Sequence, residues 1–231
     1  MPLRAHYEPG GMEIMSNALE TKDLEIRYGT QVVLQGFSLS LEPGEKALLT
    51  GPSGCGKSTV LRCFLGFVVP DAGSVSIDGE ELTADTVWRL RQLVAYVGQE
   101  PDLGTGTAAQ AIERPFHYRA NAGLRRNLDR IPELFERFNL GRDLLHKDVG
   151  SLSGGEKQRI ALVSAILLDR KVFLLDEVTS ALDKVSKQAV ADYFRERDHA
   201  TALIVAHDPE VFSFVRRVVE LPCNTRARDT A

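Results

Sequence analysis

Residues Gly51-Pro52-Ser53-Gly54-Cys55-Gly56-Lys57-Ser58-Thr59 are the most informative stretch of this chain of 231 residues. They fit the pattern G-x-x-x-x-G-K-[ST] of a phosphate-binding loop. The context also fits, because the apolar run at 47–49 predicts a buried strand and the apolar residues within 60–65 predict a helix. Glycines let backbone N–H groups converge on a phosphate, and a helix N-terminus adds partial positive charge. The stretch therefore predicts a nucleotide-binding loop, and the alternative is a chance glycine-rich turn.

Two side chains of this Walker A motif have predicted roles. Lys57 is expected to reach the β- and γ-phosphates of ATP, and Ser58 to ligate Mg²⁺. Cys55 has two interpretations: an oxidisable thiol at a helix N-terminus, or a small residue of which only the backbone matters. The ATP-binding residues predicted from the loop are Gly51, Pro52, Ser53, Gly54, Cys55, Gly56, Lys57, Ser58 and Thr59.

The second motif is Lys171-Val172-Phe173-Leu174-Leu175-Asp176-Glu177, an apolar strand that ends in two carboxylates. Asp176 is expected to hold Mg²⁺, directly or through its water shell, as in a Walker B motif. Glu177 is placed to polarise the attacking water. Two acids after a strand alone would suggest a solvated loop, but their pairing with a Walker A motif favours the catalytic interpretation.

The third motif is Leu152-Ser153-Gly154-Gly155-Glu156-Lys157-Gln158-Arg159. Ser153 and Glu156 have the spacing of a capping box, so part of this pattern is an ordinary helix start. However, Ser-Gly-Gly also leaves N–H groups open at a helix N-terminus, which is an anion site. The chain therefore either binds two anions, or each site is half of a shared one.

The composition is that of a globular protein, with 43% hydrophobic and 26% charged residues and a net charge of −4. This balance argues against a strongly basic nucleic-acid binder. The three cysteines argue against a disulfide framework and for a reducing compartment. No apolar run reaches the roughly 18 residues of a membrane span, and the N-terminus lacks a signal-peptide core. We expect a cytoplasmic protein with a flexible leader at residues 1–17, in which Met12 or Met15 is an alternative start.

The remaining pattern predicts an α/β fold in residues 18–231. Strands and helices alternate at both ends of the chain, which implies a mainly parallel sheet covered on both faces. Between residues 86 and 158 the pattern is mostly helical, with one strand at 94–97, and predicts an inserted helical subdomain. The early strands and turns predict an antiparallel β part. The prediction is a P-loop NTPase core with these two additions.

The motifs together resemble those of ATP-binding-cassette (ABC) ATPases, over about residues 19–221. Residues 152–158 look like the ABC signature. Tyr28 matches the aromatic residue that stacks on adenine, although a strand-edge aromatic is the alternative. Gln99 matches the Q-loop glutamine, with a plain loop amide as the alternative. His207 matches the switch histidine, with a structural histidine as the alternative, and 180–183 matches the D-loop.

The resemblance implies a homodimer in which two cassettes stack head to tail around ATP. Glu177 would be the general base, His207 would contact the γ-phosphate, and Lys57 would complete the catalytic set. Gln99 would ligate Mg²⁺ with Ser58 and Asp176, and would sense a membrane subunit. The residues expected to contact the ATP of the partner are Ser153, Gly154, Gly155, Glu156 and Asp183.

A closer resemblance is to FetA-type ATPases, bacterial cassettes linked to iron export. It rests on residues 51–59, 153–160 and 176–183, on the segment Arg114-Pro115-Phe116-His117-Tyr118-Arg119, and on Val178 in place of a proline. It implies an exporter ATPase, cytoplasmic and peripheral on the inner face of the membrane, that works with a separate membrane permease. The alternatives are an importer ATPase for a small solute and a soluble ABC ATPase of a complex-assembly system.

Overall fold

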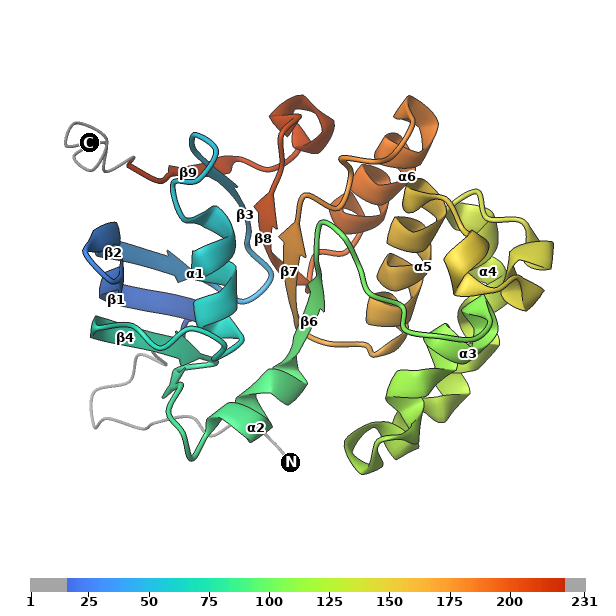
Figure 1. Cartoon of the computed structure of the whole chain (residues 1–231), viewed down its shortest axis with the longest axis horizontal. Helices are drawn as coiled ribbons and strands as arrows, with labels where there is room; N and C mark the ends of the chain where they lie inside the picture. The colour runs from blue at the N-terminus through green and yellow to red at the C-terminus, as the bar shows by residue number, and fades with distance from the viewer. Residues whose placement is uncertain (1–15, 223–231) are drawn as a thin grey trace.

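The computed structural model describes residues 16–222 (Figure 1). The expected leader therefore lies outside the described residues, except for Ser16 and Asn17. Asn17 belongs to the folded part, because its carbonyl accepts the Gly79 N–H at 3.1 Å and its side chain donates to Glu20 at 2.9 Å. Cys223 lies outside the described residues.

A parallel sheet forms the centre of the molecule. Its five strands are, in spatial order, β6 (Val94–Val97), β7 (Val172–Asp176), β8 (Thr201–Val205), β3 (Lys46–Thr50) and β9 (Arg217–Glu220). Every neighbouring pair is parallel. β7 and β8 are buried along their whole length, as expected of apolar runs covered on both faces.

A second, antiparallel sheet lies beside the first (Figure 1). Its spatial order is β2 (Gln31–Leu41), β1 (Leu19–Tyr28), β4 (Ala72–Ile77) and β5 (Glu80–Glu81). Leu24 and Ile26 of β1 are buried between exposed or half-buried neighbours, which is the alternation of a sheet with one covered face. β1 pairs with both β2 and β4.

Helix α1 (Lys57–Phe64) lies between the two sheets (Figure 1). Its apolar side chains share one core with β1, β2 and with one face of the parallel sheet, including Leu174 and Leu203. Helices α5 (Gly154–Leu167) and α6 (Lys184–Arg195) cover the other face, where Phe173 and Ile204 point. Alternate residues of each central strand therefore belong to different cores.

The helices α3 (Ala108–Glu113) and α4 (Ile131–Arg137) lie beyond α5, whereas α2 (Val87–Leu90) lies near β4 and leads into β6 (Figure 1). The 3₁₀ helices are at Arg91–Leu93, Arg114–His117, Arg119–Arg130, Arg142–His146, Val149–Ser151 and Pro209–Phe212. The range 86–158, predicted as the helical subdomain, also contains β6, which pairs with β7 and belongs to the parallel sheet. Among residues 16–222, no helix is long and apolar enough to cross a membrane. The predicted architecture of a mainly parallel core, an antiparallel β part and an inserted helical part is confirmed.

Candidate ATP-binding and hydrolysis site

The loop at 51–56 connects β3 to α1; its three glycines all have positive φ, and two of them also lack room for a Cβ. Gly51 has φ 145° and Gly56 has φ 105°, a region that L-residues rarely adopt. A Cβ at Gly51 would lie 2.8 Å from Cys55 Sγ, and one at Gly56 would lie 2.9 Å from Val33 Cγ1. The loop is thus packed closely against the strand β2 on one side and against its own Cys55 on the other.

Lys57 closes over this loop. Its Nζ donates to the carbonyls of Gly51 at 2.8 Å and Pro52 at 3.0 Å. No side chain caps the start of α1, and its first turn contains no acidic residue. The ammonium group and the first N–H groups of the helix therefore lie together at one end of α1, an arrangement that suits a phosphate.

The two cysteines near the loop are buried. Cys55 is packed beneath Gly51. Burial raises the pKa of the Cys63 thiol to about 12, so this thiol stays protonated and unreactive near neutral pH. Cys63 packs in the core between α1 and the sheets.

Asp176 and Glu177 end the central strand β7, and both carboxyl groups are nearly inaccessible to solvent. Asp176 is 5% exposed and Glu177 is 9% exposed. Asp176 Oδ1 and Glu177 Oε2 are buried without a hydrogen-bond partner. Unpaired buried carboxylate oxygens are costly, and they indicate a site that takes a further ligand.

Glu177 also has an unusual backbone. Its φ of 53° is a left-handed conformation, which a non-glycine residue adopts at a cost. Hydrogen bonds hold this conformation: the Glu177 N–H donates to Val205 O at 2.9 Å, and its carbonyl accepts the Ser180 N–H at 3.0 Å. Backbone strain of this kind clusters at functional sites.

His207 follows the neighbouring strand β8 and reaches back to Glu177. Its Nε2 lies 2.9 Å from Glu177 Oε1. The contact follows from the topology, because Asp176 pairs with Val205 at the carboxyl end of the sheet. The imidazole is exposed while the carboxylate is buried, so His207 is the part of this pair that faces outward.

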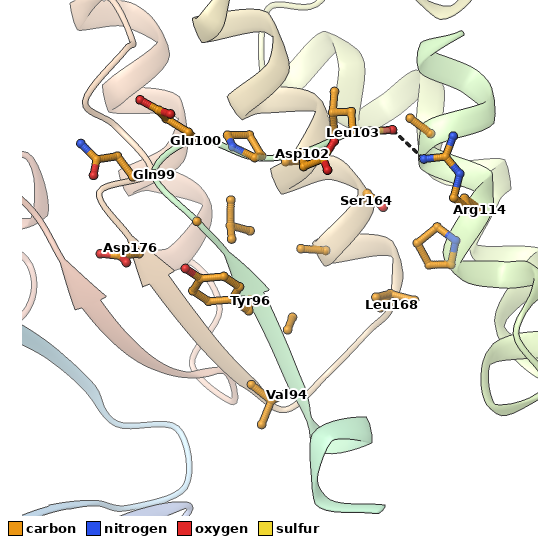
Figure 2. Close-up of a pocket in the computed structure, with 18 of the residues that line it drawn as sticks. Val94, Tyr96, Gln99, Glu100, Asp102, Leu103, Arg114, Ser164, Leu168 and Asp176 are labelled. Carbon is orange, nitrogen blue, oxygen red and sulfur yellow. Dashed lines mark hydrogen bonds between the residues drawn. The ribbon is translucent and has the colours of Figure 1, made fainter. Parts of the chain in front are cut away.

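Gln99 follows β6, on the other side of β7. Gln99, Ser58 and Asp176 line one cavity of about 1220 Å³. Figure 2 shows Gln99 and Asp176 at adjacent strand ends, with the hydroxyl of Tyr96 directed toward Asp176. Burial and the Asp176 carboxylate raise the pKa of Tyr96. Tyr96 was not among the residues predicted from the sequence, because its place beside Asp176 depends on the pairing of β6 with β7.

The donor set at this cavity fits Mg²⁺ bound together with a polyphosphate. Ser58 supplies a hydroxyl and Asp176 an unpaired carboxylate oxygen. Among residues 16–222, no three His, Cys, Asp or Glu side chains are grouped to hold a metal ion by themselves. Mg²⁺ commonly takes one or two protein oxygens and completes its shell with phosphates and water.

Tyr28 lies at the end of β1 in the hairpin with β2, paired with Gln31. Its ring is exposed. The next residues of the hairpin, Val33 and Leu34, border Gly56 of the loop. The structure therefore brings the hairpin of Tyr28 beside the phosphate loop.

The third motif lies apart from these residues. Ser153 begins α5 with a capping box: its Oγ accepts the Glu156 N–H at 3.3 Å, and Glu156 Oε2 accepts the Ser153 N–H at 2.8 Å. The Ser153 hydroxyl also donates to Glu156 Oε2 at 2.8 Å, and the two bonds that this carboxylate accepts lower the pKa of Glu156. Within residues 16–222, no hydrogen bond or ion pair joins 153–156 to the loop at 51–59.

Asp183 lies next to this helix start in space. It caps α6 by accepting the Ser186 N–H at 2.8 Å, and this bond lowers the pKa of Asp183. A Cβ on Gly155 would lie 2.8 Å from the carbonyl of Ala181, so the start of α5 packs tightly on residues 180–183. The two segments thus form one continuous surface.

Comparisons with known proteins agree with these observations. The family model for ABC transporters matches residues 34–180. The chain is 35% identical over 218 residues to the probable iron export ATP-binding protein FetA of Escherichia coli (strain K12), covering 91% of this chain and 93% of that protein. It is 34% identical over 223 residues to the Fe(3+) ions import ATP-binding protein FbpC 2 of Rhodococcus jostii (strain RHA1), covering 93% of this chain and 62% of that protein.

A similar solved structure is the dimeric post-hydrolysis state of the ATP-binding cassette MJ0796 bound to ADP and Pi. It has a TM-score of 0.74 and 27% identity, covering 88% of this chain and 94% of that one. The predicted resemblance to ABC ATPases, and to the FetA type among them, is confirmed. The chain belongs to the ABC transporter family, as an ATP-binding subunit that hydrolyses ATP.

Proposed function

We propose that two copies of this chain bind ATP head to tail and hydrolyse it to drive the export of a solute through a separate membrane permease. The observation that carries this proposal is the separation of two phosphate-binding elements. The Walker A loop lies beside Asp176 and Glu177, whereas the capped start of α5, within residues 16–222, makes no hydrogen bond or ion pair to that loop. Ser153, Gly154, Gly155, Glu156 and Asp183 are therefore assigned to the ATP held by the partner copy.

Within each site the residues divide the work by position. Lys57 and the N–H groups of residues 51–59 bind the phosphates, and Tyr28 stacks on the adenine. Glu177 accepts a proton from the attacking water through its buried carboxylate, and His207 holds that carboxylate and faces the γ-phosphate. Ser58, Asp176 and Gln99 would hold Mg²⁺, which neutralises charge on the phosphates when bound.

The cavity beside Gln99 supports docking of the permease. Its lining includes two exposed aromatic side chains, Phe67 at 67% and Tyr118 at 66% exposure. Aromatic side chains in an open groove are typical anchors for a partner segment. A permease segment bound here would contact Gln99, which lies next to the catalytic carboxylates. This contact would also place the chain on the cytoplasmic face of the membrane.

Export of iron or another metal ion is the cargo assignment that the comparisons favour. FetA is named as a probable iron export ATP-binding protein and is 35% identical to this chain, while FbpC 2, named as an Fe(3+) import protein, is 34% identical. Import of a small solute is the second candidate, supported by the latter similarity. In either case the cargo would pass through the separate permease.

Copurification with the permease tests the proposal. A multi-span protein encoded beside this chain would be the candidate permease; the two are co-expressed, the complex is captured, and its ATPase activity is measured with and without Fe²⁺. We expect a complex in which iron stimulates ATP hydrolysis. The double variant Phe67→Ala/Tyr118→Ala should lose capture and keep its basal ATPase, while Val218→Ala, another exposed apolar residue, should behave as wild type. Equal capture of both variants would contradict the docking assignment.

A further inference from the structure

We propose that Gln158 is a positioning residue of the ATPase site: its side-chain amide holds the backbone of Glu177 and of Gly98 in the arrangement that hydrolysis requires. This inference rests on the proposed role of Glu177 as the base. Gln158 is a polar residue in α5 that the capping box and the phosphate contacts leave unexplained.

The side chain of Gln158 is buried between two strand ends. Only 1% of the residue is exposed. Its Nε2 donates to Gly98 O at 3.3 Å and to Glu177 O at 3.4 Å. Both neighbours are carbonyl oxygens, which only accept hydrogen bonds, so the amide nitrogen must be the atom that faces them.

The two carbonyls lie where the ladder between β6 and β7 ends. The parallel register runs from Val94 opposite Val172 to Val97 opposite Leu175, and it stops there. Gly98 and Glu177 follow these last pairs, and the chain diverges toward the Q-loop on one side and the D-loop on the other. The amide of Gln158 therefore supplies, from α5, hydrogen bonds at the point where the ladder stops.

The contacts of Gln158 are important because the two carbonyls belong to segments that carry proposed site residues. Glu177 adopts φ 53°, a strained conformation that its surroundings must hold in place. Gly98 directly precedes Gln99, which lines the cavity with Asp176. One buried amide thus fixes the backbone of the base and the backbone that carries the proposed Mg²⁺ ligand.

Gln158 also connects the two halves of the proposed dimer site. It is four residues after Gly154 on the same helix, so the helix start that would contact the ATP of the partner copy is rigidly joined to the base that acts on the ATP of its own copy. A residue with a purely structural role would stabilise the fold without a selective effect on kcat. A positioning residue would lower kcat and leave nucleotide binding nearly unchanged.

The first experiment replaces Gln158 with methionine, which has a similar length and no donor. Gln188→Met is the matched control, because Gln188 is an exposed glutamine of α6 whose amide reaches only Asp192. We expect kcat of Gln158→Met to fall at least about tenfold, with KM and the dissociation constant of a fluorescent ATP analogue within about threefold of wild type. Gln188→Met should keep the wild-type kcat. Wild-type kcat in folded Gln158→Met would overturn the inference.

The second experiment asks whether Gln158 acts through Glu177. Gln158→Met is added to Glu177→Gln, and residual hydrolysis is measured at high protein concentration. We expect a further loss of less than about threefold, because the positioned group is already disabled. A further loss as large as in the wild-type background would overturn the inference.

These outcomes stay separate from those of the proposed function. If Glu177→Gln alone hydrolysed ATP at the wild-type rate, the base assignment would fail, whatever Gln158 does. If Glu177→Gln were inactive and Gln158→Met normal, only the positioning role would fail. Should Gln158→Met not fold, as judged by thermal unfolding, Gln158→Asn carries the same test, since it retracts the amide by one methylene from both carbonyls.

Discussion

Two helix starts in this molecule carry glycines and suit an anion, but they differ in capping and in burial. The loop before α1 is enclosed by β2 and β3, has no capping side chain, and lies beside two buried carboxylates. The start of α5 is exposed, and its own Ser153 and Glu156 already satisfy part of its backbone. The first is a nearly complete nucleotide cradle, whereas the second is a surface that needs a ligand brought to it. This difference is what a site shared between two copies requires.

Removing the carboxylate of the proposed base, Glu177, should have the largest effect of these changes, and it should act on turnover. We expect Glu177→Gln to lower turnover by about 10³-fold, the range for loss of a general base, while ATP binding is retained. Light scattering should show the variant to be monomeric alone and dimeric with saturating ATP, since both helix starts are intact. Glu210→Gln, a change at an exposed acid of the same sheet edge, is the control. A Glu177→Gln variant that stayed monomeric would argue against the shared site.

Closing the cradle at α1 should have the next largest effect. Gly56→Ala adds a Cβ at 2.9 Å from Val33 and forces alanine to φ 105°, so we expect ATP affinity to fall about a hundredfold. Gly54→Ala is the matched control: it also has a positive φ, of 79°, but its Cβ would meet no atom within 4 Å. Equal losses of affinity, measured by calorimetry, would show that the packing against β2 does not shape the loop.

A change at the start of α5 should separate binding from turnover. Gly154 is exposed, and a Cβ there would lie 3.8 Å from Ala181, an ordinary contact. We expect Gly154→Ala to fold and to bind ATP as wild type, with turnover and ATP-dependent dimerisation reduced about tenfold or more by the added methyl group at the partner's phosphate. Gly123→Ala, with open space around its Cβ, is the control. Reduced ATP binding by the monomer would contradict this assignment.

The smallest effect should come from the caps themselves. The helices α3 and α5 both begin with a capping box, at Thr107 and Ser153. Ser153→Ala and Thr107→Ala should each cost about 1 kcal/mol of stability and lower Tm by about 2–4 °C. Only Ser153→Ala should also weaken ATP-dependent dimerisation, because only that hydroxyl is assigned to a nucleotide. Identical behaviour in both assays would make Ser153 a cap and nothing more.

The sequence allowed the main features of the site to be predicted because they depend on local patterns and on one rule of topology. The loop at 51–59, the acids at 176–177 and His207 each follow a strand, and the carboxyl ends of parallel strands share one edge of a sheet. Their convergence could therefore be expected before the structure was known. The capping box at Ser153 is equally local.

What the sequence could not provide depends on packing between distant segments. The left-handed backbone of Glu177 is held by Val205 and Gln158, which no short pattern connects. The position of Tyr96 beside Asp176 requires that β6 pair with β7, although β6 lies within a mostly helical stretch of the sequence. Hydrogen bonds of this kind follow from the assembled fold and have no signature of their own.

Mixing two variants of low activity tests the shared site most directly. Lys57→Ala lacks the phosphate-binding lysine and keeps an intact α5 start, while Gly154→Ala has the reverse combination. In a two-fold dimer, half of the mixed molecules would be heterodimers with one of two sites intact, so we predict ATP hydrolysis at about a quarter of the wild-type rate. Hydrolysis no greater than the mean of the two separate variants would contradict the shared site.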